Sequence, residues 1–94
     1  MGEEKLMEDK EFMEKAKDMV LEYYNNQVEI TDNYLLNESN VYIVWMCSIL
    51  GNNKALLSTT VSDGMYYEIT YDNNNNKFYF DAYKKWDHQE YDNS

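Results

Sequence analysis

Four stretches rich in β-branched and aromatic residues follow one another in the second half of the sequence. They are Val41 to Leu50, Lys54 to Val61, Met65 to Tyr71 and Lys77 to Tyr83. The breaks between them consist of Gly, Asn, Asp and Ser residues, which tolerate the backbone conformations of tight turns. Because breaks of this length join neighbouring antiparallel strands, the pattern predicts a four-stranded antiparallel meander sheet.

The segment before these strands has the period of a helix. From Asp9 to about Asn25 the apolar residues return every three or four positions, which places them on one face of a helix. They are Phe12, Ala16, Met19, Val20 and Tyr23, and charged residues occupy the opposite face. We therefore predict an α+β fold in which an N-terminal amphipathic helix packs on the sheet.

The length of the chain indicates a single domain. Residues 1–94 can bury one hydrophobic core but not two, and we expect the ordered part to run from about residue 8 to residue 87. No apolar run is long enough to span a membrane, and the acidic N-terminus is unlike a secretory signal. Since the one cysteine, Cys47, cannot form an internal disulfide, we expect a cytoplasmic protein.

The first predicted strand is apolar on both of its faces. Val41, Ile43, Trp45, Cys47 and Ile49 alternate with Tyr42, Val44, Met46 and Leu50. Such a strand needs cover on two sides, but one helix covers only one face of a four-stranded sheet. The other face is left to the connector between helix and sheet, to the C-terminal tail, or to another protein chain.

Tyrosines gather on the face that the helix leaves open. Regular alternation through the strands places Tyr42, Met46, Tyr66, Tyr79 and Tyr83 on this side. Aromatic and methionine side chains are enriched in protein interfaces, so we predict that these five residues bind a partner. One alternative is an ordinary sheet surface, on which tyrosine occurs because it favours β-strands. A second alternative is a small-molecule site.

The charge of the chain bears on the kind of partner. Asp and Glu outnumber Lys by 18 to 8, which gives a formal net charge of −10. Such a surface repels the phosphates of nucleic acids, so direct nucleic-acid binding is not expected. Three interpretations of the negative charge remain open. It keeps the protein soluble, it attracts a basic partner, or it lets the chain imitate a nucleic acid in the basic cleft of a partner.

Residues with catalytic potential are few. His88 is the only histidine and lies in the polar tail, and Cys47 is expected to be a small buried apolar residue. Glu68 and Asp81 fall on the open side of adjacent strands, so a carboxylate-based enzyme is an alternative reading. We predict a protein without enzymatic activity, with no metal and no cofactor.

Three stretches of the sequence carry a resemblance to a known family. Residues 41–45 (VYIVW), 54–68 (KALLSTTVSDGMYYE) and 81–86 (DAYKKW) resemble an uncharacterised family of small proteins from phages and prophages of low-GC Gram-positive bacteria. The similarity runs from about Glu8 to Asp87. It implies no catalytic residues. It does imply a context, in which a phage accessory protein in the host cytoplasm binds and inhibits a host protein.

One specific form of this interpretation is an anti-defence or anti-CRISPR-type inhibitor, which binds a host defence protein and imitates nucleic acid in its basic cleft. Self-association is a separate alternative. In that alternative the open face joins two copies of the chain, and the protein is a homodimer with no inhibitory role.

Overall fold

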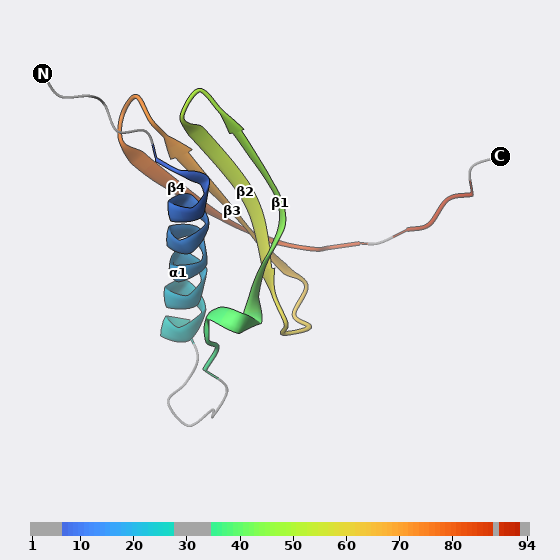
Figure 1. Cartoon of the computed structure of the whole chain (residues 1–94). Coiled ribbons are helices and arrows are strands. Elements are labelled where there is room, and N and C mark those ends of the chain that lie inside the picture. The colour runs from blue at the N-terminus through green and yellow to red at the C-terminus, as the bar shows by residue number, and fades with distance from the viewer. Residues whose placement is uncertain (1–6, 28–34, 88, 93–94) are drawn as a thin grey trace, which may run out of the picture.

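The computed structural model describes residues 7–27, 35–87 and 89–92. One helix, α1 (Asp9–Gln27), packs on one face of a sheet (Figure 1). The strands are β1 (Val41–Ile49), β2 (Asn52–Thr59), β3 (Met65–Asp72) and β4 (Lys77–Lys84), and a short 3-10 helix, η1 (Glu38–Asn40), precedes β1. The four strands lie in chain order, each antiparallel to the next. The predicted α+β fold with a meander sheet is confirmed.

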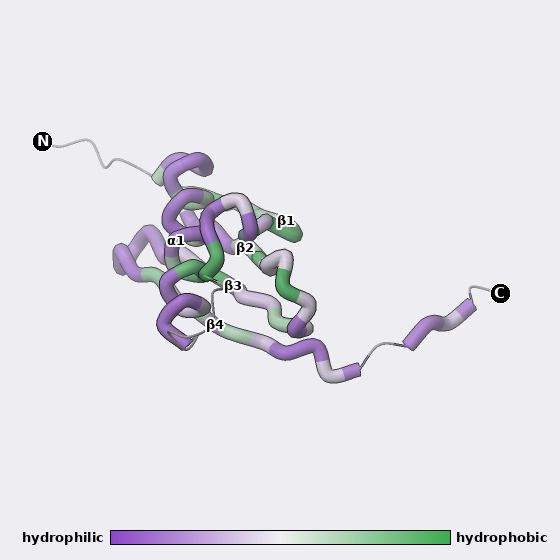
Figure 2. The backbone as a smooth tube through the Cα atoms, turned by 90° about the horizontal axis from the view of Figure 1, so that it is seen from below, coloured by the Kyte–Doolittle hydropathy of each residue, from purple (hydrophilic) through white to green (hydrophobic). Residues whose placement is uncertain are grey.

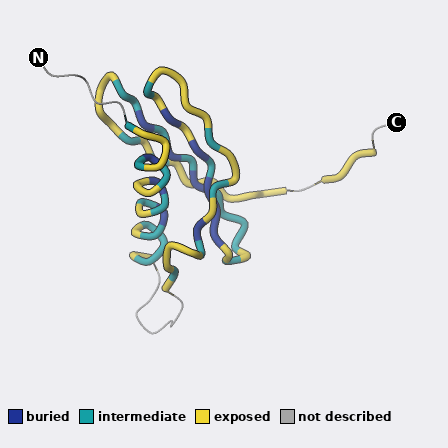
Figure 3. Tube along the Cα trace, viewed as in Figure 1, coloured by how far each residue is buried: buried dark blue, intermediate teal, exposed yellow. Residues whose placement is uncertain are grey.

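The core lies between α1 and the covered face of the sheet. The buried apolar residues are Phe12, Ala16, Val20, Val41, Ala55, Leu57, Tyr67, Ile69 and Tyr71. On the helix, Phe12 stacks on Phe78 of β4 with ring centroids 6.4 Å apart, and Tyr23 meets Tyr67 edge-on at 5.7 Å. Figure 3 shows that burial concentrates in the two central strands, so most of β1 and β4 is more accessible.

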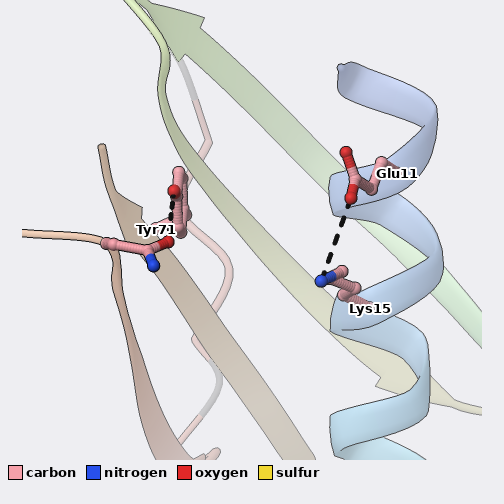
Figure 4. Close-up of polar contacts among 4 residues, drawn as sticks. Glu11, Lys15 and Tyr71 are labelled. Carbon is pink, nitrogen blue, oxygen red and sulfur yellow. Dashed lines mark hydrogen bonds and ion pairs between the residues drawn. The ribbon is translucent and has the colours of Figure 1, made fainter. Parts of the chain in front are cut away.

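Polar contacts hold the periphery of this core. The Tyr71 hydroxyl donates a 2.8 Å hydrogen bond to Asn76 Oδ1 across the β3–β4 hairpin (Figure 4). On the solvent side of α1, Lys15 Nζ lies 3.9 Å from Glu11 Oε2, one helical turn away (Figure 4). This pair is exposed, so it contributes little to stability. The hairpin bond is partly buried and anchors the end of β3.

The first hairpin turns earlier than the sequence pattern predicts. Its loop is Leu50 and Gly51, and β2 begins at Asn52 instead of Lys54. Both loop residues have positive φ, 53° and 82°, as in a type I′ turn. Gly adopts this conformation freely, whereas Leu does so only at a cost in backbone strain. Asn53, predicted as part of the turn, is a buried residue of β2.

A β-bulge interrupts β1. Ile43 pairs with Leu57, and Trp45 pairs with Leu56, the next residue along β2. Val44 is therefore an extra residue without an opposite partner in β2. An extra residue of this kind reverses the alternation of faces in the rest of the strand.

The bulge overturns two predictions about β1. Met46 was predicted on the open face, but it is partly buried and packs against the core. Cys47 was predicted to be buried, but it is exposed. Trp45 and Ile49 are turned outward with Cys47, and they are 42% and 63% exposed. The regular alternation assumed from the sequence holds only as far as Ile43.

We expect that deletion of Val44 leaves the fold intact. Ile43 and Trp45 already pair with consecutive residues of β2, so joining them directly keeps every side chain of β1 on its present face. The free energy of unfolding should change by no more than about 1 kcal/mol. Urea denaturation followed by circular dichroism measures this change.

Deletion of Met46 is the matched control. It also removes one residue from β1, but it moves the Trp45 indole into the position opposite Ala55 that Met46 occupies. Overfilling a packed core costs about 1–3 kcal/mol. If the Val44 deletion is as destabilising as the Met46 deletion, the assignment of Val44 as the extra residue is wrong.

Candidate functional site

The face of the sheet turned away from α1 has no helix or loop packed on it in the described part of the chain. We call it the open face. Its side chains are those of Tyr42, Trp45, Cys47, Ile49, Lys54, Leu56, Ser58, Tyr66, Glu68, Thr70, Tyr79, Asp81 and Tyr83. Figures 1 and 2 show that α1 lies on the other side and that the described residues beyond β4 lead away from the sheet.

Large aromatic side chains are partly exposed on the open face. Tyr42, Tyr79 and Tyr83 are 48%, 48% and 52% exposed, and Tyr66 is half-buried. The structure thus places these four of the five residues predicted to bind a partner on one face, where Tyr66 and Tyr83 lie opposite each other. Trp45 joins them in place of Met46, because of the bulge. Exposed aromatic side chains are enriched in interaction sites.

A pair of carboxylates lies among these tyrosines. Glu68 on β3 and Asp81 on β4 are directly opposite each other, a position in which side chains are about 4.5–5.5 Å apart at Cβ. Tyr66 and Tyr83 form the next opposite pair on the same face, and Tyr79 lies two residues before Asp81. We call these five residues the tyrosine-carboxylate cluster. Sequence analysis found each member but assigned the carboxylates and the tyrosines to different hypotheses.

The negative charge of the cluster is compensated only in part. Lys54 Nζ lies 3.5 Å from Glu68 Oε1, and Lys54 is itself about half exposed, so water screens this ion pair. Asp81 is exposed, and no ion pair to it occurs within the described ranges. Like charges directly opposite each other destabilise a sheet. The cluster is therefore suited to receive a cation from outside.

A shallow apolar hollow lies beside the cluster. Its volume is about 470 Å³, and it is lined by Trp45, Cys47, Ile49, Asn52, Asn53, Lys54 and Thr70. The bulge creates this hollow, because it turns the apolar second half of β1 outward. Sequence analysis missed the hollow, since it assumed regular alternation and an extra residue leaves no periodic signal in a strand that is apolar on both faces.

Two ionisable side chains outside the cluster have shifted pKa values. Burial, with a smaller contribution from the charge of Asp63, raises the pKa of Tyr67 to about 12, so this core tyrosine is neutral at physiological pH. Hydrogen bonds from the Asn75 side chain and from the loop backbone lower the pKa of Asp72. Both shifts follow from local packing and hairpin structure and not from the cluster.

Groups that would support other chemistry were also located. No set of three His, Cys, Asp or Glu residues within residues 7–27, 35–87 and 89–92 is arranged to hold a metal ion. His88 lies outside the described residues. Nor is any helix in the described ranges long and apolar enough to cross a membrane.

Comparison with known proteins adds a family match. Residues 13–93 match a family described as a family of unknown function (DUF6275). No curated protein matches the chain, and no solved structure does. The matched region includes most of α1 and all of the sheet, and so it contains every residue of the open face.

Proposed function

We propose that this chain, which belongs to the DUF6275 family of unknown function, is a non-catalytic protein that docks its open face on a partner protein. The tyrosine-carboxylate cluster carries the proposal. It places two opposed carboxylates among three tyrosines on a sheet face that no helix or loop covers in the described part of the chain.

Arginine is the partner side chain that suits the cluster best. Its guanidinium group is planar, donates hydrogen bonds to carboxylates, and stacks on aromatic rings. Asp81 offers a carboxylate that forms no ion pair among the described residues. Tyr79 and Tyr83 lie two residues away on either side of it along the same face of β4. A lysine would satisfy the charge but would not match the planar rings.

The remainder of the open face supports the same docking mode. The hollow beside Trp45 accepts an apolar side chain of the partner next to the arginine. The net charge of −10 accelerates the approach of a basic surface from a distance. A basic patch with an exposed arginine and a neighbouring apolar residue is therefore the complementary surface.

The resemblance to phage and prophage proteins narrows the class of partner. It favours a host protein whose basic surface normally binds nucleic acid, and binding of the acidic chain would block that surface. Inhibition of a host defence protein is the specific form of this proposal. If this proposal is correct, nucleic acid and this chain compete for the same surface of the partner, and each excludes the other.

A capture experiment with matched variants tests the docking face. Wild-type chain, Tyr83→Ser and Tyr91→Ser are immobilised and exposed to lysate of the cell in which the chain is expressed. Tyr83 belongs to the cluster, whereas Tyr91 is an exposed tyrosine of the C-terminal segment, 81% accessible. We expect one protein to be retained by the wild type and by Tyr91→Ser and to be lost with Tyr83→Ser.

The retained protein is then purified and its affinity measured by calorimetry. Truncation of a tyrosine that is an interface hot spot costs about 2 kcal/mol or more, so the dissociation constant should rise at least about tenfold for Tyr83→Ser. Equal affinities of Tyr83→Ser and Tyr91→Ser would refute the open face as the docking site.

A further inference from the structure

We propose that two copies of this chain pair along the outer edge of β1 and form one continuous eight-stranded sheet. β1 is an edge strand, hydrogen-bonded to β2 on one side only, and Figure 1 shows it as the outermost strand. Within residues 7–27, 35–87 and 89–92, no further strand pairs with the backbone groups on the other side of β1, and such groups can accept one. The inference concerns this edge and not the open face, so it does not depend on the proposed function.

The β1 edge lacks charged residues and proline, which normally prevent such pairing, and its one bulge lies before the segment 45–49 that we propose pairs. Edge strands are commonly protected by charged side chains or proline, and β4, the other edge, carries Lys77, Asp81 and Lys84. No charged residue and no proline occurs between Glu38 and Lys54. Apolar side chains are exposed there instead, with Val44 45% accessible and Ile49 63% accessible.

Charge makes a second copy the occupant that fits this edge. Two chains with a net charge of −10 repel each other over most of their surfaces. Stacking of two open faces would also bring two tyrosine-carboxylate clusters near each other. The β1 edge is a long segment of the sequence without charged residues, so the paired strands themselves place no like charges opposite each other. The Asp9 carboxylate beside it lies on the helix side of the sheet and accepts a 2.9 Å hydrogen bond from the Ser48 hydroxyl. In a dimer joined along β1, the open faces of the two copies also lie side by side.

The hairpin defines which residues of β1 pair. The two residues that flank a two-residue loop exchange hydrogen bonds, here Ile49 and Asn52. Alternation then directs the backbone groups of Cys47 toward β2 and those of Met46 and Ser48 toward the outer edge. Antiparallel pairing about a twofold axis at Cys47 therefore hydrogen-bonds Met46 of each copy to Ser48 of the other.

This register explains the exposed side chains of the regular part of β1. Each Trp45 lies opposite Ile49 of the second copy, on the open-face side, and the two Cys47 side chains face each other at the axis. Opposite residues that are not hydrogen-bonded have Cα atoms about 4.5 Å apart, which is within the range of a disulfide. Two apolar contacts thus flank the axis, and the two hollows become neighbours.

A charge-swap experiment tests the pairing. Sedimentation equilibrium of the purified wild-type chain should give a mass of twice 11.3 kDa. Cys47→Asp and Cys47→Lys each place like charges opposite each other at the axis, so each variant alone should be at least tenfold weaker in self-association. An equal mixture of the two should restore the dimer. A monomeric wild type, or variants that dimerise like the wild type, would overturn the proposal.

Cross-linking of the native thiol tests the register. Diamide takes up two electrons and two protons from a pair of thiols, which leaves one disulfide. Wild-type chain should form a disulfide-linked dimer at least tenfold faster than Cys47→Ser/Tyr79→Cys, which carries its only thiol at an exposed position of β4. Equal rates would show random collision and would contradict pairing at Cys47. Neither experiment contains a partner protein. A negative result would therefore refute the dimer and would leave the docking proposal unaffected.

Discussion

Replacement of Phe12 by alanine is expected to remove a large fraction of the stability of the fold. Phe12 is fully buried in the core and stacks on Phe78 of β4, on the far edge of the sheet. Truncation of a buried Phe costs about 3–5 kcal/mol, and a small domain has a total stability of about 5–15 kcal/mol. Because α1 alone covers this face of the sheet in the described part of the chain, no neighbouring helix can fill the cavity.

Denaturation with urea, followed by far-UV circular dichroism, measures this loss. Met13→Ala is the matched control, since Met13 is the next residue of α1, is only partly buried, and does not belong to the core cluster. We expect the control to lose about 1 kcal/mol or less. Similar losses for the two variants would mean that α1 does not pack on the sheet through the face assigned to it.

Reversal of the charge at Asp81 is expected to weaken partner binding strongly without weakening the fold. In Asp81→Lys the ammonium group would meet the arginine that we propose for the partner. Loss of a buried charge pair costs about 2–5 kcal/mol, so affinity should fall by a factor on the order of 100 or more. The introduced lysine would also lie opposite Glu68, where opposite charges contribute about 0.2–1 kcal/mol to sheet stability.

Two measurements on the same variant separate these effects. Calorimetry with the captured partner gives the affinity, and urea denaturation gives the stability. Asp18→Lys changes the net charge equally but on the exposed side of α1, and it should retain most of the affinity apart from a modest effect on the association rate. If Asp18→Lys loses as much affinity as Asp81→Lys, general charge attraction and not the cluster drives binding.

The stability of Asp81→Lys also tests why Glu68 and Asp81 lie opposite each other. Opposed like charges lower the stability of a sheet, yet Glu68 and Asp81 keep that arrangement. Proteins retain locally unfavourable arrangements mainly at functional sites. An increase in stability together with a loss of binding would identify the pair as functional. A loss of stability would contradict this interpretation.

Local patterns in the sequence predict the class of the fold and much of the open face. The helical period before residue 25 and the strand alternation after residue 41 are local consequences of where apolar side chains must point. Tyr66, Tyr79 and Tyr83 lie in regular strands, so counting residues placed them correctly. Tyr42 also comes before the bulge, and its predicted face is correct for the same reason.

Contacts between strands, which no local pattern reveals, set the faces of the second half of β1 and the grouping of residues across strands. The extra residue at Val44 exists only relative to β2, and both faces of β1 are apolar, so no period in the sequence marks the change. Met46 therefore packs inward, and Trp45 and Cys47 face outward. The pairing of Glu68 with Asp81 likewise depends on register between strands, which hydrogen bonds and hairpin loops determine, not the order of residues within either strand.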